Sequence, residues 1–150
     1  MTAERRTFPA RTDEVTQVTA YVERRCRELG AEPQAALRLT LVAEELFVNV
    51  AVHGYRNGPG EVTLSVTEAG DELELTHEDR APPFNPFKGV RRPTTLAAAR
   101  EAKAGGLGRV LVAAIATRRS YARRGGCNRV TVAVAKRRAP VARKKTRKKS

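Results

Sequence analysis

The stretch LTLVAEELFVNVAV, from residue 39 to residue 52, constrains the fold of this 150-residue chain more than any other part of the sequence. Apolar side chains occupy nearly every position, which predicts a helix that is buried on most sides. Yet the same stretch contains Glu44, Glu45 and Asn49. A carboxylate that leaves water without a partner is unfavourable, so we expect this polar stripe to line a cavity that holds water, a cation or a ligand.

The spacing within the stripe suggests what that cavity could do. Glu45 and Asn49 are four residues apart and share one helix face, which His53 continues one turn later. The amide oxygen of Asn49 suits a hard cation such as Mg²⁺, and Glu45 can take a proton from an attacking hydroxyl or water. Such pairs are also common on solvent-facing helices, so that plainer interpretation stays open. For His53 we favour a partly buried structural histidine at the helix end.

Helical periodicity dominates the chain up to a turn at residues 56–60. Thr12 or Asp13 can cap the first helix, Gly30 ends it, and Pro33 suits the first turn of the second helix. The predicted elements of this half are an edge strand over 4–9, a helix from about 12 to 29 and a helix from 33 to about 53.

After residue 60 the period changes to two. Val62, Leu64 and Val66 alternate with polar residues, as do Leu73 and Leu75, which predicts a β-hairpin with one buried face. The other predicted elements are a long loop over 80–104 with a short helix near 96–103, a third helix from 108 to about 117, and strands over 120–123 and 129–135. This order indicates an α+β fold, a two-layer α/β sandwich with helices on one face of a mixed, mostly antiparallel sheet.

Two further motifs point to a phosphate-bearing ligand. Gly105, Gly106, Leu107 and Gly108 precede the third helix, where a close backbone and free N–H groups can bind an anion. Asp79, at the end of the hairpin, can accept a hydrogen bond from an exocyclic amine and so select adenine over guanine. A simple helix-entry turn and a polar turn are the respective alternatives.

The charge of the chain is concentrated at its end. The formal net charge is +13, and residues 136–150 hold nine Lys or Arg and no acidic residue, which leaves +4 on residues 1–135. We therefore predict one domain over 1–135 and a basic disordered tail over 136–150. The tail can contact a polyanion, such as nucleic acid, an acidic protein or an anionic surface, or it can simply be a solubilising end.

Composition excludes several other classes of protein. Cys26 and Cys127 form no C-x-x-C motif, and with two histidines the chain has no zinc-type ligand cluster. The apolar run at 110–116 is too short to cross a bilayer, and no apolar segment follows the charged N-terminus. We expect a cytoplasmic protein without membrane contact.

In order and spacing, four segments resemble the GHKL ATP-binding superfamily. Within it they are most similar to the bacterial anti-sigma-factor serine/threonine kinases of the stress-response and sporulation type. VAEELFVNVAVHGY at 42–55 resembles their N-box, EDRAPPFNP at 78–86 the box that holds adenine, and GGLG at 105–108 the glycine box after the ATP lid. YARRGGCNRVTVAV at 121–134 resembles their last two strands. The resemblance implies a Bergerat-type ATP-binding fold.

The resemblance also implies roles for individual residues. Glu45 maps onto the catalytic base, Asn49 onto the Mg²⁺ ligand, and Asp79 onto the carboxylate that recognises adenine. Residues 82–104 map onto the lid, and Asn128 lies near adenine. The phosphate loop maps onto Gly105, Gly106, Leu107 and Gly108.

Three features depart from the family pattern. Ala81 stands where glycine is common, and Arg109 stands where an apolar residue is usual. Arg109 could contact a phosphate or point to solvent. The basic tail belongs to no part of the pattern.

By this resemblance the chain is expected to be a Mg-ATP-dependent kinase. It would phosphorylate a serine or threonine of an anti-sigma-factor antagonist, bind and silence a sigma factor, and form a homodimer. Two alternatives remain. One is a module of the same fold that binds ATP without phosphotransfer, and the other is a nucleic-acid-associated protein that acts through residues 136–150.

Overall fold

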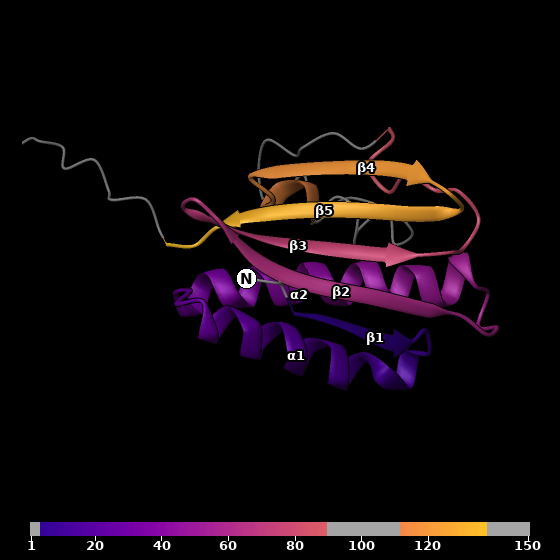
Figure 1. Ribbon diagram of the computed structural model, residues 1–150, viewed down its shortest axis with the longest axis horizontal. Helices are drawn as coiled ribbons and strands as arrows, with labels where there is room; N and C mark the ends of the chain where they lie inside the picture. The colour runs from indigo at the N-terminus through magenta and orange to yellow at the C-terminus, as the bar shows by residue number, and fades with distance from the viewer. Residues whose placement is uncertain (1–3, 90–111, 138–150) are drawn as a thin grey trace, which may run out of the picture.

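The computed structural model describes residues 4–89 and 112–137 (Figure 1). A short strand and two helices come first, and two β-hairpins follow. The strands are β1 (Arg5–Pro9), β2 (Glu61–Ala69), β3 (Glu72–Asp79), β4 (Arg118–Arg124) and β5 (Cys127–Ala135). The helices are α1 (Val15–Glu28) and α2 (Pro33–Asn49), with a 3₁₀ turn, η1 (Thr12–Glu14), before α1 and a π-helical turn, η2 (Val50–Gly54), after α2.

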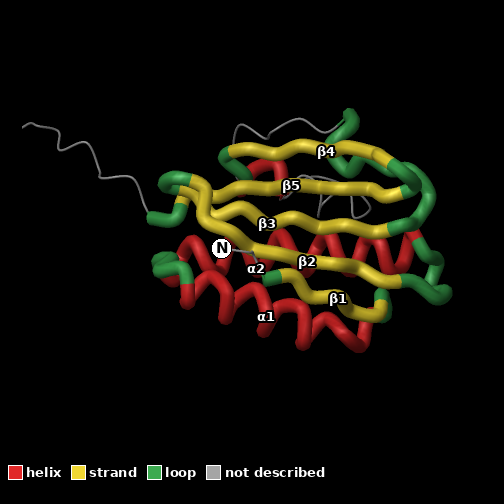
Figure 2. Tube along the Cα trace, viewed as in Figure 1, coloured by secondary structure: helices red, strands yellow, loops and turns green. Residues whose placement is uncertain are grey.

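The strands form one sheet in the order β1-β2-β3-β5-β4. Every described strand pairing is antiparallel. This agrees with the mostly antiparallel sheet predicted from the sequence, but the described residues contain no parallel pair that would make the sheet mixed. Both helices lie on the same face of the sheet (Figures 1 and 2). The two-layer α/β sandwich predicted from the sequence is therefore confirmed.

The core lies between the two layers and follows the period-two pattern of the hairpin. Val62, Leu64 and Val66 of β2 and Leu73 and Leu75 of β3 are all fully buried. Burying a side chain of this size stabilises the fold by about 1.5–3 kcal/mol. The same alternation continues along β3, and its last two inward-facing residues, His77 and Asp79, are polar and lie at the edge of the core.

The beginning of α1 differs from the prediction, whereas its end agrees with it. Neither Thr12 nor Asp13 caps α1, because both lie in η1 and the N-cap is Glu14, which makes no capping hydrogen bond through its side chain. Gly30 ends the helix with a φ of 78°, a conformation in which a side chain would be strained. The N–H groups of Gly30 and Ala31 donate to carbonyls of the last turn, as in a Schellman motif.

Helix α2 starts with Pro33 in its first turn, as predicted. Its C-terminal continuation, η2, widens into a π turn that ends at Gly54. A Cβ on Gly54 would lie 2.8 Å from Val50 Cγ2 and 3.0 Å from Ala81 Cβ. Only glycine therefore lets the end of the helical layer approach the segment that follows β3, and this approach brings the two together around one pocket.

Several predictions fall on residues outside the described ranges. These are most of the long loop, its short helix, Arg109 and the glycine motif at 105–108. Residues 112–115 are helical, in agreement with the end of the third predicted helix. In the basic segment only Lys136 and Arg137 are described, and Lys136 forms an ion pair with Glu68.

No helix among the described residues is long and apolar enough to span a membrane.

Candidate functional site

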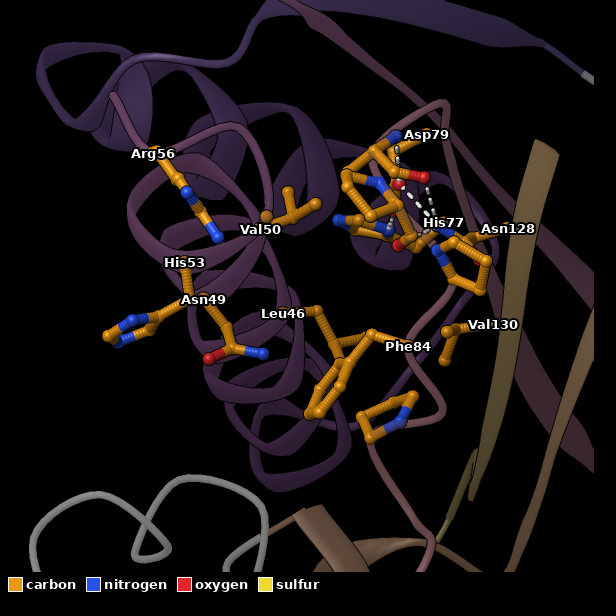
Figure 3. A pocket seen from close by; sticks show the side chains of 15 residues that line it. Leu46, Asn49, Val50, His53, Arg56, His77, Asp79, Phe84, Asn128 and Val130 are labelled. Atoms are coloured by element: carbon orange, nitrogen blue, oxygen red, sulfur yellow. Dashed lines mark hydrogen bonds and ion pairs between the residues drawn. The ribbon is translucent and has the colours of Figure 1, made fainter. Parts of the chain in front are cut away.

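A pocket opens between the C-terminal part of α2 and the ends of β3 and β5 (Figure 3). Asn49, Val50 and Leu46 lie on its helical wall, and Asp79 and Asn128 lie on the opposite wall. Its volume is about 230 Å³, below the range of about 300–1,000 Å³ typical of sites for drug-sized ligands. The described walls therefore suit a single flat ring system better than a complete nucleotide.

Most of the lining is apolar, and a smaller set of polar residues completes it. The apolar lining consists of Leu46, Val50, Gly54, Ala81, residues 82–84, Pro86 and Val130. The polar lining consists of Asn49, His53, Arg56, His77, Asp79 and Asn128. Apolar walls with a small set of convergent polar groups are characteristic of small-molecule sites.

Asp79 is the best-positioned acceptor in this pocket. Its side chain is buried, and one oxygen, Oδ1, accepts hydrogen bonds of 2.9 Å from both the Ala81 N–H and Asn128 Nδ2. The other oxygen, Oδ2, accepts no hydrogen bond from any described residue. Two donors thus fix the orientation of the carboxylate and leave one oxygen available to a ligand.

The amide of Asn128 is the centre of this arrangement. Besides Asp79, its Nδ2 donates to the carbonyls of Ala81 and Pro82, at 3.0 and 3.2 Å. Its Oδ1 accepts a 2.6 Å hydrogen bond from the Tyr121 hydroxyl. Arg123 adds a 2.8 Å hydrogen bond to the Ala81 carbonyl. The β4–β5 hairpin therefore holds Asp79 and the segment after it in place, so Asn128 acts by positioning Asp79.

Asn49 lies where the sequence placed it, on the wall facing Asp79 (Figure 3). Glu45, one turn earlier on α2, is half-buried, but it is not among the residues that line the pocket. Within the described part of the chain Glu45 makes no hydrogen bond or ion pair. Asn49 and Glu45 are both half-buried, and the glycine motif that should face them falls outside the described residues.

His53 is exposed and its imidazole points away from Asp79 (Figure 3). Its position at the helix end agrees with the sequence interpretation, but its exposure does not agree with the partial burial expected there.

His77 is the lining residue that the sequence analysis missed. It follows Leu73 and Leu75 on the inward face of β3, and its side chain is 2% exposed. Burial lowers the pKa of His77 to about 4, against the weaker opposing effect of the Asp79 charge. The imidazole is therefore neutral at physiological pH. The signal in the sequence was the period-two pattern, which extends through residues 73, 75, 77 and 79.

Tyr55 joins the helical wall of the site to the strand wall. Its hydroxyl donates to the Glu61 carbonyl at 2.8 Å and accepts from the Arg80 N–H at 2.7 Å, directly after Asp79. We expect Tyr55→Phe to lower the free energy of unfolding by about 1–3 kcal/mol, because two backbone groups lose their partner. Urea denaturation measures this change, and an unchanged midpoint would show that water replaces the hydroxyl. Tyr121→Phe, which removes a part-buried phenol hydrogen bond to a side chain rather than to the backbone, is the matched variant.

Comparison with known families adds a decisive observation. A model of the histidine kinase-like ATPase domain matches residues 8–134. The chain belongs to this family. A search of curated proteins finds no match.

Membership of the histidine kinase-like ATPase family indicates the ligand class of the domain, which is ATP. The chain is a GHKL-type ATPase domain, so an ATP-binding, kinase-like function follows. The match includes both walls of the pocket, the Asn49 wall and the Asp79 wall. The glycine motif at 105–108 also lies within the matched range.

Proposed function

We propose that this histidine kinase-like ATPase domain is an anti-sigma-factor serine/threonine kinase. It transfers the γ-phosphate of ATP to a serine or threonine hydroxyl of an anti-sigma-factor antagonist. The hydroxyl oxygen forms a bond to the γ-phosphorus, and the bond from that phosphorus to the β–γ bridging oxygen breaks. ADP leaves with the bridging oxygen, and the hydroxyl proton passes to a carboxylate.

One observation carries the proposal: Asn49 and Asp79, on two different elements, line the same pocket from opposite walls. Asp79 Oδ2 can accept a hydrogen bond from the exocyclic amine of adenine, which guanine replaces by a carbonyl acceptor. The apolar lining between the walls suits the faces of the base. Asn49 is then on the side of the pocket toward which the phosphates would extend.

The residues also fit a magnesium ion that is held mainly by ATP. The described part of the chain contains no group of three or more His, Cys, Asp or Glu side chains that could hold a metal alone. Mg²⁺ in phosphoryl-transfer sites typically takes one or two protein oxygens and completes its shell with phosphates and water. The amide oxygen of Asn49 would be that protein ligand. The ion would supply neutralisation of phosphate charge.

Glu45 is the proposed base. It lies one helical turn from Asn49 on α2 and has no partner among the described residues that would neutralise it. A carboxylate there can accept the proton of the incoming hydroxyl. The glycine motif at 105–108 would hold the phosphates through its backbone N–H groups.

The partners follow from the same proposal. When the antagonist is absent or phosphorylated, the chain binds a sigma factor and silences it, and it does so as a homodimer in the cytoplasm. The basic segment 136–150 offers an additional contact for a polyanion.

The test is phosphotransfer from radiolabelled Mg-ATP to a purified anti-sigma-factor antagonist. Glu45→Gln should lower the initial rate about 100-fold, because a proton acceptor is lost, while ATP affinity stays within threefold. The matched control is Glu44→Gln, the neighbouring glutamate, which is also half-buried. We expect this control to retain the wild-type rate.

The position of Glu45 outside the pocket lining favours one second candidate, a domain that binds ATP without transferring phosphate. Tight ATP binding by the wild type, with equal and negligible label transfer by wild type and Glu45→Gln, would establish that function instead.

Magnesium dependence tests Asn49 separately. We expect Mg²⁺ to tighten ATP binding of the wild type about tenfold or more and to leave Asn49→Ala nearly unaffected, because one ion ligand is lost. Asn49→Asp, which keeps an oxygen at the same position, should retain the enhancement. Calorimetric titration with and without Mg²⁺ measures it, and equal enhancement in wild type and Asn49→Ala would contradict the assignment.

A further inference from the structure

His77 is a polar side chain in an apolar position. On β3 it follows the fully buried Leu75, and across the sheet it pairs with Leu64 of β2 and Val130 of β5. Both ring nitrogens are buried, and neither has a hydrogen-bond partner in the described part of the chain. Leaving a buried polar group without a partner is unfavourable, because the group loses its hydrogen bonds to water. Such groups are rare in folded proteins and call for an explanation.

The pocket provides that explanation, because His77 is one of its lining residues. The imidazole lies on the same wall as Asp79, two residues further into the strand (Figure 3). Its Nδ1 is 3.8 Å from Asp79 Oδ2, too far for a hydrogen bond between the two. A neutral imidazole carries one N–H donor and one acceptor nitrogen. The wall therefore places a carboxylate acceptor and a buried imidazole side by side at the edge of the pocket. Because both imidazole nitrogens are buried, a ligand would reach an N–H there only after a small shift of the side chains around it.

Adenine carries the complementary pair. Its amine is a donor, and each ring nitrogen beside the amine, N1 or N7, is an acceptor. Asparagine and glutamine recognise adenine in this bidentate manner, with one acceptor and one donor on a single side chain. Asp79 and His77 could supply the same two groups from neighbouring inward positions of one strand.

We propose that His77 is a second base-recognising residue, whose N–H donates to the adenine ring nitrogen beside the amine while Asp79 Oδ2 accepts from that amine. This inference rests on the proposed ATP site and deepens it, because it assigns the specificity of the site to a pair of residues. The other donors near this carboxylate, the Ala81 N–H and Asn128 Nδ2, already donate to Oδ1.

The experiment pairs a change in the protein with a change in the ligand. ATP, 1-deaza-ATP and 7-deaza-ATP are titrated into the wild type and into His77→Val, which introduces a β-branched apolar side chain suited to an inward strand position. We expect His77→Val to weaken ATP binding about tenfold, the value of one hydrogen bond of about 1.4 kcal/mol. We expect one of the two deaza analogues to bind the wild type about tenfold more weakly than ATP, and to bind His77→Val as tightly as ATP does.

A triphosphate of unsubstituted purine, which lacks the amine, serves as the ligand control. Its loss of binding affinity relative to ATP should be the same in wild type and His77→Val, because the missing amine contacts Asp79 and not His77. The analogue that loses its penalty in the variant identifies N1 or N7 as the acceptor.

Three outcomes would overturn the inference while leaving the ATP site intact. In the first, His77→Val binds ATP as tightly as the wild type does. In the second, each deaza analogue loses the same affinity relative to ATP in both proteins, and in the third the wild type binds GTP as tightly as ATP. The wild-type ligand series needs no variant, so a folding defect in His77→Val does not remove the test. Failure of the wild type to bind ATP at all would instead refute the proposed function.

Discussion

Replacing Asp79 by Asn is expected to lower the affinity for ATP about a thousandfold, the largest effect of any single change in the pocket. The substitution keeps the size and shape of the side chain. One oxygen can still accept from the Ala81 N–H and Asn128 Nδ2, as Oδ1 does now. The other position becomes an NH₂ donor, which would face the amine of adenine donor to donor. The penalty combines a lost charge-assisted hydrogen bond with a buried donor that has no partner.

Calorimetric titration of ATP measures this loss, and circular dichroism checks that the fold persists. The matched control is Asp71→Asn, in the exposed turn between β2 and β3, which should bind ATP like the wild type. If Asp79→Asn bound ATP within threefold of the wild type, Asp79 would not contact the base. A gain of GTP binding by this variant would support the contact, because an amide donor can pair with the guanine carbonyl.

The sequence was sufficient to predict most of the fold, because its periodicities are strong. Alternation at Val62, Leu64 and Val66 fixed which face of the hairpin is buried. Gly30 and Pro33 fixed a helix end and a helix start, since each acts through its own backbone geometry. The start of α1 could not be predicted in the same way. A 3₁₀ turn at Thr12–Glu14 and an α-helix cap at Thr12 or Asp13 use the same residue types.

The site was predicted in part, for a different physical reason. Asn49 and Asp79 are polar residues in apolar surroundings, so each could be noticed locally, and the structure brings them to one pocket. Their roles in binding stay predictions. The support that Asn128 gives to Asp79 depends on the pairing of β3 with β5, which places the two residues directly opposite each other. No local pattern predicts such a cross-strand contact in detail.

His77 escaped notice because the property that makes it unusual is tertiary. A histidine at an inward strand position is normally explained by a hydrogen bond to a neighbouring element. Only the packed structure shows that Leu64 and Val130 flank it across the sheet and that its two nitrogens have no partner among the described residues. The sequence indicates the position of this residue, and the tertiary environment indicates its possible role.

The same burial makes the stability of the protein sensitive to acid. Lowering the pH from 6.5 to 4 is expected to remove about 3 kcal/mol from the free energy of unfolding through His77 alone. The unfolded chain binds a proton at this residue near its ordinary pKa of 6.5, whereas the folded chain resists protonation until about pH 4. Between these values the unfolded state holds more protons, so stability falls as the pH falls.

Urea denaturation of wild type and His77→Val across this pH range measures the effect. Carboxyl groups titrate in the same range in both proteins, so the informative quantity is the difference between their free energies of unfolding. We expect that difference to move by about 3 kcal/mol in favour of His77→Val between pH 6.5 and 4. At pH 7 the variant should be at least as stable as the wild type, because it removes a buried polar group that has no partner among the described residues. Parallel pH profiles for the two proteins would mean that the imidazole of His77 is accessible to water and protons in the folded state.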